Sequence, residues 1–480
     1  MAFVKYSSVN SLSEKTLVLI ENGQLDKALR TIHDFVERII TEPLCTAQVF
    51  GSKVLDDLCQ QIGQANLKNV KQQNLIDSPR PILSQEQPTI IYLVTKLQRS
   101  GGHTRVIEDF IKSKPLAKHI ILSTELDGAS DLDYVNQICL NNNITFEKSH
   151  RINYIQRLTW LQQHLIAYQP SEVFLFNHHQ DSIAVAAIQP SMQFNATFYH
   201  HGDHHLCLGV YLPYFKHIDP HPMGYHNCRN VLHIENTYVP LTTDDKGDRP
   251  ESLRFFSNET LTTCTAARSN KVEVPYFVSY LELIPRILKT TQGKHVHIGR
   301  LTPWALYKIK KQLKKNGVHQ DRFIYIEWVP SVWKTLHEYQ VDLYIASFPY
   351  GGGLTLVEAM GAGIPVALHK HMYSKFLSCI ELGYPNAFNW RFPQELINYC
   401  KSLTAEELQK ASRSARLQYE KFHSTSLNQN DLDLIPFHKK SSFTIESDEW
   451  GFWMERQLTL KRVILRTMYR TFKRYRAFLS

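Results

Sequence analysis

The spacing of apolar side chains changes along the chain and divides it into regions. Over residues 11–70, apolar residues recur at three- and four-residue steps with almost no strand signal, a spacing typical of amphipathic helices. From residue 89 onward, short apolar runs alternate with helical patterns, which indicates parallel strands joined by crossover helices. The stretch 68–87 is polar and contains Pro79 and Pro81, so it predicts a linker.

The short apolar runs predict two α/β domains. Strands expected in the first domain are Thr89–Thr95, His119–Ser123, Glu172–Asn177 and Ala196–His200. Strands expected in the second include Phe323–Glu327, Asp342–Ala346 and Ile364–Leu368. We therefore divide the chain into a helical region over residues 1–75, α/β domains over 88–240 and 255–425, and a cross-over segment with a basic amphipathic helix over 426–480.

The most informative segment covers residues 342–368 and reads as strand, glycine turn, helix and strand. A glycine turn that opens a helix presents backbone N–H groups and a positive dipole end, which suit a phosphate or diphosphate. Beyond the glycines, Thr355 adds a hydroxyl, and Glu358 can reach sugar hydroxyls beside the anion. The alternative is a turn that binds no ligand, although three consecutive glycines are a costly way to build one. The candidate donor-binding residues here are Gly351, Gly352, Gly353, Leu354, Thr355 and Glu358.

The segment Pro349–Val366 resembles the donor-binding segment of GT-B glycosyltransferases. It is most similar to the group of O-GlcNAc transferase and bacterial protein N-glycosyltransferases, with Glu358 in the place of the group's acid. It carries one threonine, Thr355, where that group often has several. The retaining transferases with a Glu-x7-Glu pattern are less similar, because Tyr350 stands where their first acid lies. The resemblance implies two Rossmann-like domains facing a cleft, and Tyr350 favours inversion at the anomeric carbon.

The same resemblance implies roles for residues outside this segment. Arg268 or Lys271 would neutralise the leaving diphosphate. The equal alternative for each of them is a solvated surface residue without a role in binding. Gly299 would permit close approach at the base of the nucleotide pocket, and Arg300 would touch phosphate. In the first domain, the loop that begins at Gly101, Gly102 and His103 resembles the GT-B loop that faces the cleft. An ordinary strand-to-helix turn is the alternative for this loop.

Histidines are concentrated where the strands of the first domain end. Two runs carry them, Asn177–Asp181 and Tyr199–His205, and Tyr214, His217, Asp219, His221 and His226 follow. A histidine beside a carboxylate suits general-base catalysis, so His201, Asp203 and His204 are candidate catalytic residues. Two alternatives stay open, a metal site of the His-x-Asp-His type and structural, hydrogen-bonded histidines. The resemblance implies transfer without a metal, so we expect no metal ligands and no cofactor besides the nucleotide-sugar substrate.

Composition and charge limit the remaining possibilities. Mean hydropathy is −0.30, and no run approaches the roughly 18 apolar residues of a membrane span. The N-terminus lacks a basic region followed by an apolar core, so we expect no secretory signal. Eight cysteines without a Cys-x-x-Cys pair indicate free thiols in a reducing compartment. We therefore expect a cytoplasmic protein.

The net charge of +9 is concentrated near the C-terminus, where residues 451–480 carry eight basic residues against Glu455. Aromatic and aliphatic residues interleave with these charges at roughly helical spacing, which suits an anionic membrane surface at residues 456–480. Packing of this helix on the protein body is the alternative. No base-reading module occurs elsewhere in the sequence, so we expect no nucleic-acid partner.

These patterns predict a hexosyltransferase that moves a sugar from a nucleotide diphosphate, with a UDP-sugar favoured, to a glycan, a lipid-linked saccharide or a protein. A nucleotide-sugar epimerase on the same fold is one alternative, but it would need a pair of catalytic acids that the sequence does not show. A non-catalytic scaffold that binds partners through its helical N-terminus and basic tail is the other. The intact glycine–Glu358 segment argues against the scaffold.

Overall fold

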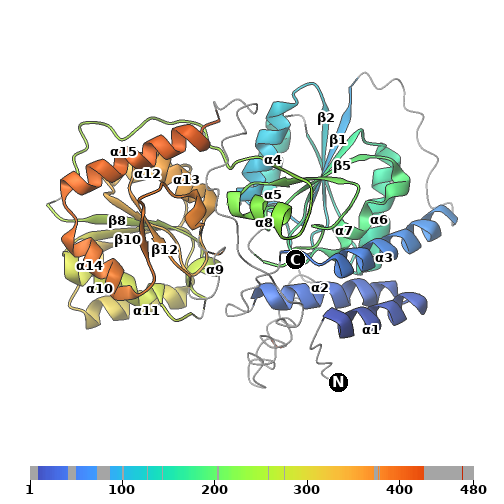
Figure 1. Cartoon of the computed structure of the whole chain (residues 1–480), viewed down its shortest axis with the longest axis horizontal. Helices are drawn as coiled ribbons and strands as arrows, with labels where there is room; N and C mark the ends of the chain where they lie inside the picture. The colour runs from blue at the N-terminus through green and yellow to red at the C-terminus, as the bar shows by residue number, and fades with distance from the viewer. Residues whose placement is uncertain are drawn as a thin grey trace. The chain divides into compact units, whose positions relative to one another are not determined.

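The computed structural model describes residues 9–41, 50–72, 87–99, 102–126, 128–142, 144–202, 205–257, 259–274, 276–371, 377, 379–425 and 468. These residues fold into two compact units, each with its own parallel sheet (Figure 1). Unit 1 takes the described residues up to Pro220 together with Gly224–Thr237, and unit 2 takes His221–Met223 and the described part of Tyr238–Thr425. The predicted basic tail lies outside the described residues, apart from Met468.

Unit 1 contains a seven-stranded sheet with the order β3-β2-β1-β4-β5-β6-β7. Its strands are β1 (Thr89–Val94), β2 (Lys118–Ser123), β3 (Thr145–Lys148), β4 (Glu172–Phe176), β5 (Asn195–Tyr199), β6 (Phe215–Asp219) and β7 (Asn236–Tyr238). Its helices are α1 (Val9–Glu21), α2 (Leu25–Thr41), α3 (Lys53–Gln72), α4 (Gly102–Ser113), α5 (Leu132–Asn142), α6 (Tyr154–Tyr168), α7 (Ser182–Ala187) and α8 (Pro222–Asn230). The registers from β3 to β6 are parallel, as the alternation of strands and helices predicts.

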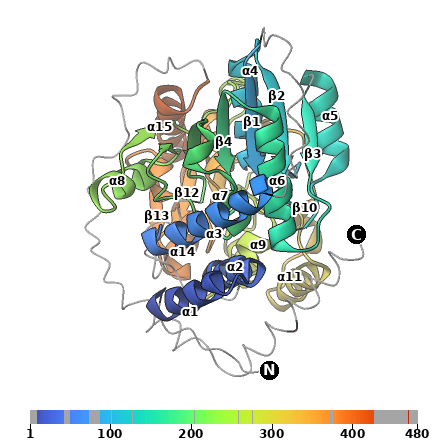
Figure 2. The ribbon, with the colours of Figure 1, turned by 90° about the vertical axis from the view of Figure 1, so that its right-hand side faces the viewer.

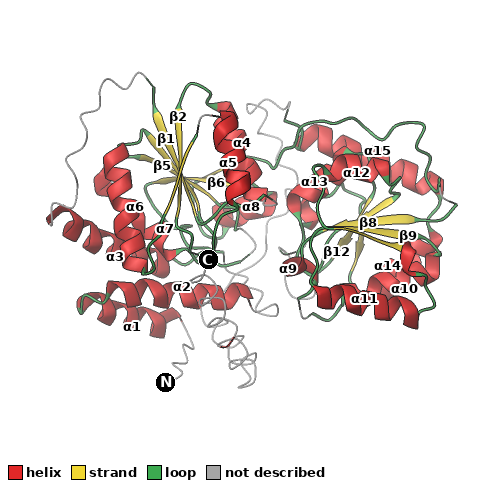
Figure 3. Ribbon diagram, turned by 180° about the vertical axis from the view of Figure 1, so that it is seen from behind, coloured by secondary structure: helices red, strands yellow, loops and turns green. Residues whose placement is uncertain are grey.

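Helices cover both faces of this sheet because successive strand residues point to opposite sides (Figure 3). In β1, Ile91 and Leu93 belong to the core shared with α6 and α7, whereas Ile90, Tyr92 and Val94 belong to the core shared with α4 and α5. The strand is therefore apolar throughout, as expected for a parallel strand that is buried on both faces.

The N-terminal helices α1–α3 belong to the core of unit 1. Helices α2 and α3 lie beside α6 and α7, and α1 packs on α2 and α3 (Figure 2). Helix α3 approaches α7 so closely that a Cβ on Gly63 would lie 1.9 Å from the carbonyl oxygen of Ala186. The buried carboxylate of Asp56 accepts hydrogen bonds from the backbone N–H groups of Gly209 (2.7 Å) and Tyr211 (2.8 Å). Burial raises the pKa of Asp56 to about 7, although these two hydrogen bonds oppose the shift.

Unit 2 contains a six-stranded sheet with the order β10-β9-β8-β11-β12-β13. Its strands are β8 (Thr262–Ala266), β9 (Lys294–Ile298), β10 (Phe323–Ile326), β11 (Leu343–Ile345), β12 (Val366–His369) and β13 (Phe388–Trp390). Its helices are α9 (Ser269–Val272), α10 (Tyr280–Thr291), α11 (Pro303–Lys315), α12 (Val332–Glu338), α13 (Gly353–Gly361), α14 (Pro393–Ser402) and α15 (Ala405–Phe422). One core joins α10, α11 and α14 to the sheet, and another joins α12, α13 and α15 to its opposite face (Figure 3).

Candidate functional site

The predicted donor-binding segment lies where the strand order of unit 2 reverses. Strand β8 is the first strand of this sheet in sequence and lies in its middle, between β9 and β11. The strand order reverses between β8 and β11, so the connections that leave these two strands run to opposite faces of the sheet. Ligands of open α/β sheets bind at this point. The loop after β8 carries Arg268 and leads into α9, and the loop after β11 carries Gly351 and Gly352 and leads into α13. The topology therefore brings together residues that are about 80 positions apart in sequence.

Lys271 joins these two loops. Its ammonium group donates a hydrogen bond to the carbonyl oxygen of Gly351, and it lies 3.6 Å from the position that a Cβ on Gly352 would occupy. Burial is the main reason that the pKa of Lys271 lies below its usual value, and the neighbouring charge of Arg268 adds to this effect. Burial also lowers the pKa of Arg268. The buried ammonium group of Lys271 thus lies beside the N-terminus of α13, where the helix dipole is positive as well, and Arg268 is near enough to Lys271 to affect its pKa.

The glycines of the turn are required by close contacts. Gly352 has a φ of −120°, which any residue can adopt, but a Cβ on it would lie 2.7 Å from Thr355 Oγ1. A Cβ on Gly353 would lie 2.9 Å from Leu241 Cδ1 and 3.1 Å from His221 Nε2. Glycine at 352 and 353 therefore leaves room for the side chains of Thr355, Leu241 and His221 at the N-terminus of α13.

Thr355 holds the turn together through its hydroxyl. Oγ1 donates to the carbonyl oxygen of Gly352 (3.1 Å) and accepts a hydrogen bond from the hydroxyl of Tyr344 (3.1 Å). One lone pair of the oxygen is left for a ligand. Thr355 is therefore placed as predicted, at the start of α13, but its proton is used within the protein.

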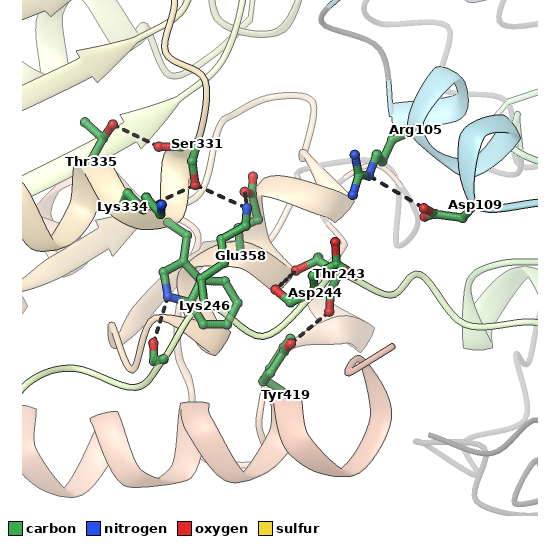
Figure 4. A network of polar contacts seen from close by, with 12 residues as sticks. Arg105, Asp109, Thr243, Asp244, Lys246, Ser331, Lys334, Thr335, Glu358 and Tyr419 are labelled. Carbon is green, nitrogen blue, oxygen red and sulfur yellow. Dashed lines mark hydrogen bonds and ion pairs between the residues drawn. The ribbon is translucent and has the colours of Figure 1, made fainter. Parts of the chain in front are cut away.

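Glu358 is oriented by a lysine that the sequence analysis did not single out. Lys246 Nζ lies 3.3 Å from Glu358 Oε1 and donates to Ser331 Oγ at 3.2 Å (Figure 4). The side chain of Glu358 is 15% exposed and that of Lys246 is 30% exposed. A partly buried ion pair of this kind holds the carboxylate of Glu358 in one position on α13.

The loop that carries Lys246 is itself attached to α15. The hydroxyl of Tyr419 donates to the carbonyl oxygen of Thr243 at 2.8 Å (Figure 4), and Arg416 Nη1 donates to Asp245 Oδ1 at 3.0 Å. The hydrogen bond from Arg416 is the main cause that lowers the pKa of Asp245. The position of Lys246 therefore depends on contacts that span more than 170 residues of sequence, which explains why no local pattern revealed it.

Gly299 and Arg300 follow β9, and the backbone of each lies against the segment that leads from β8 into α9. Gly299 has a φ of +123°, and a Cβ on it would lie 2.3 Å from the carbonyl oxygen of Ala267, so glycine is required there. The backbone of Arg300 accepts a hydrogen bond from Ser269 N at 2.9 Å. Its side chain is 79% exposed, with Nε 3.5 Å from Glu327 Oε1. Glycine at 299 thus leaves room for the backbone of Ala267, and its predicted role beneath a nucleotide stays a prediction; the guanidinium of Arg300 is mostly solvated.

The candidate residues of unit 1 are only partly described. His201 is the second residue after β5 and His178 the second after β4, and the centres of their rings are 6.1 Å apart. Asp203, His204 and Gly101 lie outside the described residues. Gly102 and His103 form the start of α4, but their side chains are not described. His221 was grouped with the histidines of the first domain in the sequence, but the structure places it in unit 2.

Comparison with known proteins defines the class of fold. No family model and no curated protein matches the chain. Among solved structures, it is similar to the apo form of the lipopolysaccharide outer core galactosyltransferase WaaB, with 16% identity over 70% of this chain and 96% of that chain and a TM-score of 0.51. It is also similar to Alr3699/HepE from Anabaena in complex with UDP and glucose, with 13% identity over 72% and 99% of the two chains and a TM-score of 0.53.

A third solved structure, a glycosyltransferase from Rickettsia africae, is 14% identical over 74% of this chain and 100% of that chain, with a TM-score of 0.52. At such identities, similarity shows the fold. The two parallel sheets and these neighbours confirm the predicted α/β class, and the chain has the GT-B fold. No helix in the described part of the chain has both the length and the apolar content that crossing a bilayer requires.

Proposed function

We propose that the chain is a glycosyltransferase that takes a sugar from a nucleotide diphosphate, with a UDP-sugar as the favoured donor. The observation that carries this proposal is the convergence of Lys271, Gly351 and Gly352 at the N-terminus of α13, where the sheet of unit 2 reverses its order. The fold supports it, since HepE has been solved with UDP and with UDP-glucose. Any other function of this site would also require a negatively charged ligand.

In the proposed complex, the diphosphate lies against the first turn of α13. The backbone N–H groups of residues 353–355 and the helix dipole would stabilise its charge, an effect of about 0.3–1 kcal/mol for an exposed anion and up to about 2 kcal/mol when it is partly buried. The ammonium group of Lys271 would turn from the carbonyl of Gly351 to a phosphate oxygen. Arg268 would add positive charge as the diphosphate leaves.

Glu358 is the proposed acceptor of hydrogen bonds from hydroxyls of the donor, held in place by Lys246. A carboxylate that accepts from a hydroxyl forms a stronger hydrogen bond than a neutral oxygen does. The role of Thr355 would be to keep the turn in shape, because its proton already bonds Gly352. Arg300, whose side chain is mostly exposed beside Glu327, would have to turn toward the diphosphate to contact it.

For the chemical step, an acceptor oxygen or nitrogen attacks the anomeric carbon, and the bond from that carbon to the diphosphate breaks with its electron pair leaving on phosphate oxygen. The acceptor proton passes to a base, for which His201, Asp203 and His204 are proposed. We propose inversion, because Tyr350 replaces the first acid of the retaining pattern, and no participation of a metal in this step.

The acceptor is proposed to be a glycan, a lipid-linked saccharide or a protein. The basic residues of 456–480 would bring the enzyme to an anionic inner membrane surface, so we propose a cytoplasmic protein that binds this surface peripherally. A nucleic-acid partner is not part of this proposal.

The experiment that tests the function measures the melting temperature of the full chain against a panel of nucleoside diphosphates and nucleotide sugars, with and without chelator. A ligand that binds the native state raises the melting temperature by mass action. We expect one diphosphate and its sugar to give the largest shift, equally large in the chelator. If no member of the panel shifts the melting temperature, the scaffold becomes the better hypothesis. Slow epimerisation of the bound sugar, detected by chromatography, would instead favour the epimerase.

A further inference from the structure

A buried cluster of four side chains in unit 1 has no part in the proposed transfer. His217 and Asp219 lie two residues apart on β6, so their side chains leave the same face of the strand. His200 follows β5, and its backbone N–H donates to the carbonyl oxygen of Ile218 at 2.8 Å, which aligns it with Asp219. Cys228 reaches the same point from α8. The side chains of His200, His217 and Asp219 are at most 3% exposed, and Cys228 is 0% exposed.

The ligand atoms of this cluster have the spacing of a tetrahedral metal site. The nitrogen, sulfur and oxygen atoms that the four residues offer lie within 4.8 Å of one another. His200 Nδ1 is 2.9 Å from Asp219 Oδ1, and Cys228 Sγ is 3.5 Å from each of these two atoms. Zinc bonds of about 2.0–2.1 Å to nitrogen and oxygen and about 2.3 Å to sulfur give tetrahedral edges of roughly 3.3 Å and roughly 3.5 Å. The 2.9 Å between His200 Nδ1 and Asp219 Oδ1 is about 0.4 Å shorter than such an edge, so this pair must separate slightly. His217, whose Nε2 is 3.1 Å from the other oxygen of Asp219, must shift as well to complete the tetrahedron.

The charges of the cluster also suit a divalent cation. A carboxylate that is 0% exposed is costly unless a positive charge neutralises it. Zinc with one carboxylate, one thiolate and two neutral imidazoles forms a site without net charge. A set of two nitrogens, one sulfur and one oxygen is typical of zinc rather than of magnesium or calcium, which prefer oxygen ligands.

An amide holds the carboxylate from outside the cluster. Asn236 Nδ2, at the start of β7, donates to Asp219 Oδ2 at 2.6 Å and to the carbonyl oxygen of Tyr225 at 2.9 Å. Hydrogen bonds of this kind orient the ligands of metal sites and help to fix the metal. The four ligands and this amide thus come from the residue after β5, from β6, from α8 and from β7, and these three strands are neighbours at one edge of the sheet.

We propose that His200, His217, Asp219 and Cys228 bind one structural zinc ion. Four protein ligands leave no open position for a substrate or a water, so the ion stabilises the fold rather than takes part in the reaction. It would tie α8 to the ends of β5 and β6 and fix the start of the segment that begins at His201. The inference does not depend on the proposed transferase activity.

The test uses the full chain purified without metal-affinity steps, with its metal content measured by plasma mass spectrometry. We expect about one zinc per chain. Removal of the zinc and titration with Co²⁺ should produce the thiolate-to-cobalt charge-transfer band of a tetrahedral site. Cys228→Ser should lose this band and most of the zinc. The matched control is Cys59→Ser, since Cys59 is also 0% exposed and lies in the same unit; it should keep both.

A wild-type chain that folds without zinc and gives no thiolate band with Co²⁺ would overturn the proposal, and the cluster would then be a hydrogen-bonded network alone. The wild-type measurement decides the matter even if Cys228→Ser fails to fold. UDP binding, measured on the same samples, tests the proposed donor site of unit 2 and does not test the zinc site of unit 1. Loss of UDP binding would therefore count against the proposed function and leave the zinc inference unchanged.

Discussion

The ammonium group of Lys271 donates a hydrogen bond to the carbonyl oxygen of Gly351, 80 residues further along the chain. This contact connects the loop after β8 to the loop after β11, and it places a cation beside the N-terminus of α13. Burial lowers the pKa of this lysine, so the folded protein disfavours its charge. A lysine at a helix N-terminus whose charge lowers the stability of the fold is a candidate for ligand binding.

Replacing Lys271 with methionine should therefore spare or increase stability. Because the pKa of Lys271 is lower in the folded protein than in the unfolded chain, its positive charge opposes folding at neutral pH. Gly351 is only partly buried, so water can replace the lost hydrogen bond. Melting temperatures of Lys271→Met and of the exposed control Lys314→Met, measured without ligand, should match or exceed that of the wild type. A large drop for Lys271→Met alone would show that the lysine is structural.

Gly352→Ala should be destabilising because of one specific contact. The new methyl group would lie 2.7 Å from Thr355 Oγ1, and moving that hydroxyl breaks its hydrogen bonds to Gly352 and from Tyr344. We expect a loss of about 1–3 kcal/mol in the free energy of unfolding. Thr355→Ala removes the obstructing atom, so the double variant should lose less than the two single variants together. Strict additivity in denaturant titrations would contradict this explanation.

Lys246→Met should weaken donor binding through Glu358. Without the ammonium group 3.3 Å away, the carboxylate is no longer held where we propose that it meets the hydroxyls of the donor. The dissociation constant of the donor should rise by roughly threefold to tenfold, which corresponds to about 0.7–1.4 kcal/mol. Lys334→Met is the control, because Lys334 is exposed on the adjacent helix α12. Equal effects of the two variants in titration calorimetry would remove Lys246 from the site.

Asp56 should make the stability of unit 1 fall as the pH rises. The pKa of its carboxyl is about 7 in the folded protein and 3.8 in a model compound, so the folded state holds the proton more tightly. The resulting stabilisation is present at low pH and is lost as the pH rises through about 7. Its size is on the order of a few kcal/mol.

The comparison of wild type with Asp56→Asn isolates this effect. The difference between their free energies of unfolding should shift against the wild type as the pH increases from 4.5 to 8. Denaturant titrations at several values of pH measure it. A difference that does not change with pH would mean that Asp56 titrates normally in the folded protein.

The sequence was sufficient for the parts of the site that are contiguous. Gly351–Gly353, Thr355 and Glu358 lie within eight residues of one another, and the helix expected after the glycine turn is α13, Gly353–Gly361. The strands predicted around it were found within one or two residues of their places. A local pattern was enough here because strand, turn and helix each have their own spacing.

Contacts between distant segments could not be predicted in the same way. Lys246 lies 112 residues from Glu358, and no periodic pattern marks it. The histidines of the first domain were noticed, but Cys228 and Asn236 join them only because β5, β6, β7 and α8 converge. Likewise, the apolar faces of α2 and α3 predicted helices, but not that these helices share a core with α7.

Short strands were also missed for a physical reason. β3, β7 and β13 have only three or four residues, and they lack the apolar run that revealed the equally short β11. Their positions at or near the edges of the sheets leave them held mainly by pairing with a longer neighbour. Such strands depend on the completed sheet, so their own residues carry little signal.

The most direct measurement is titration calorimetry of UDP with the wild type, Lys271→Met and Lys314→Met. We predict that the wild type and Lys314→Met bind UDP alike. Lys271→Met should bind at least tenfold more weakly, about 1.4 kcal/mol, while it stays folded. Undiminished binding by a folded Lys271→Met would contradict the assignment of the diphosphate to the N-terminus of α13. No binding by the wild type, to UDP or to any other nucleoside diphosphate, would contradict the proposed function.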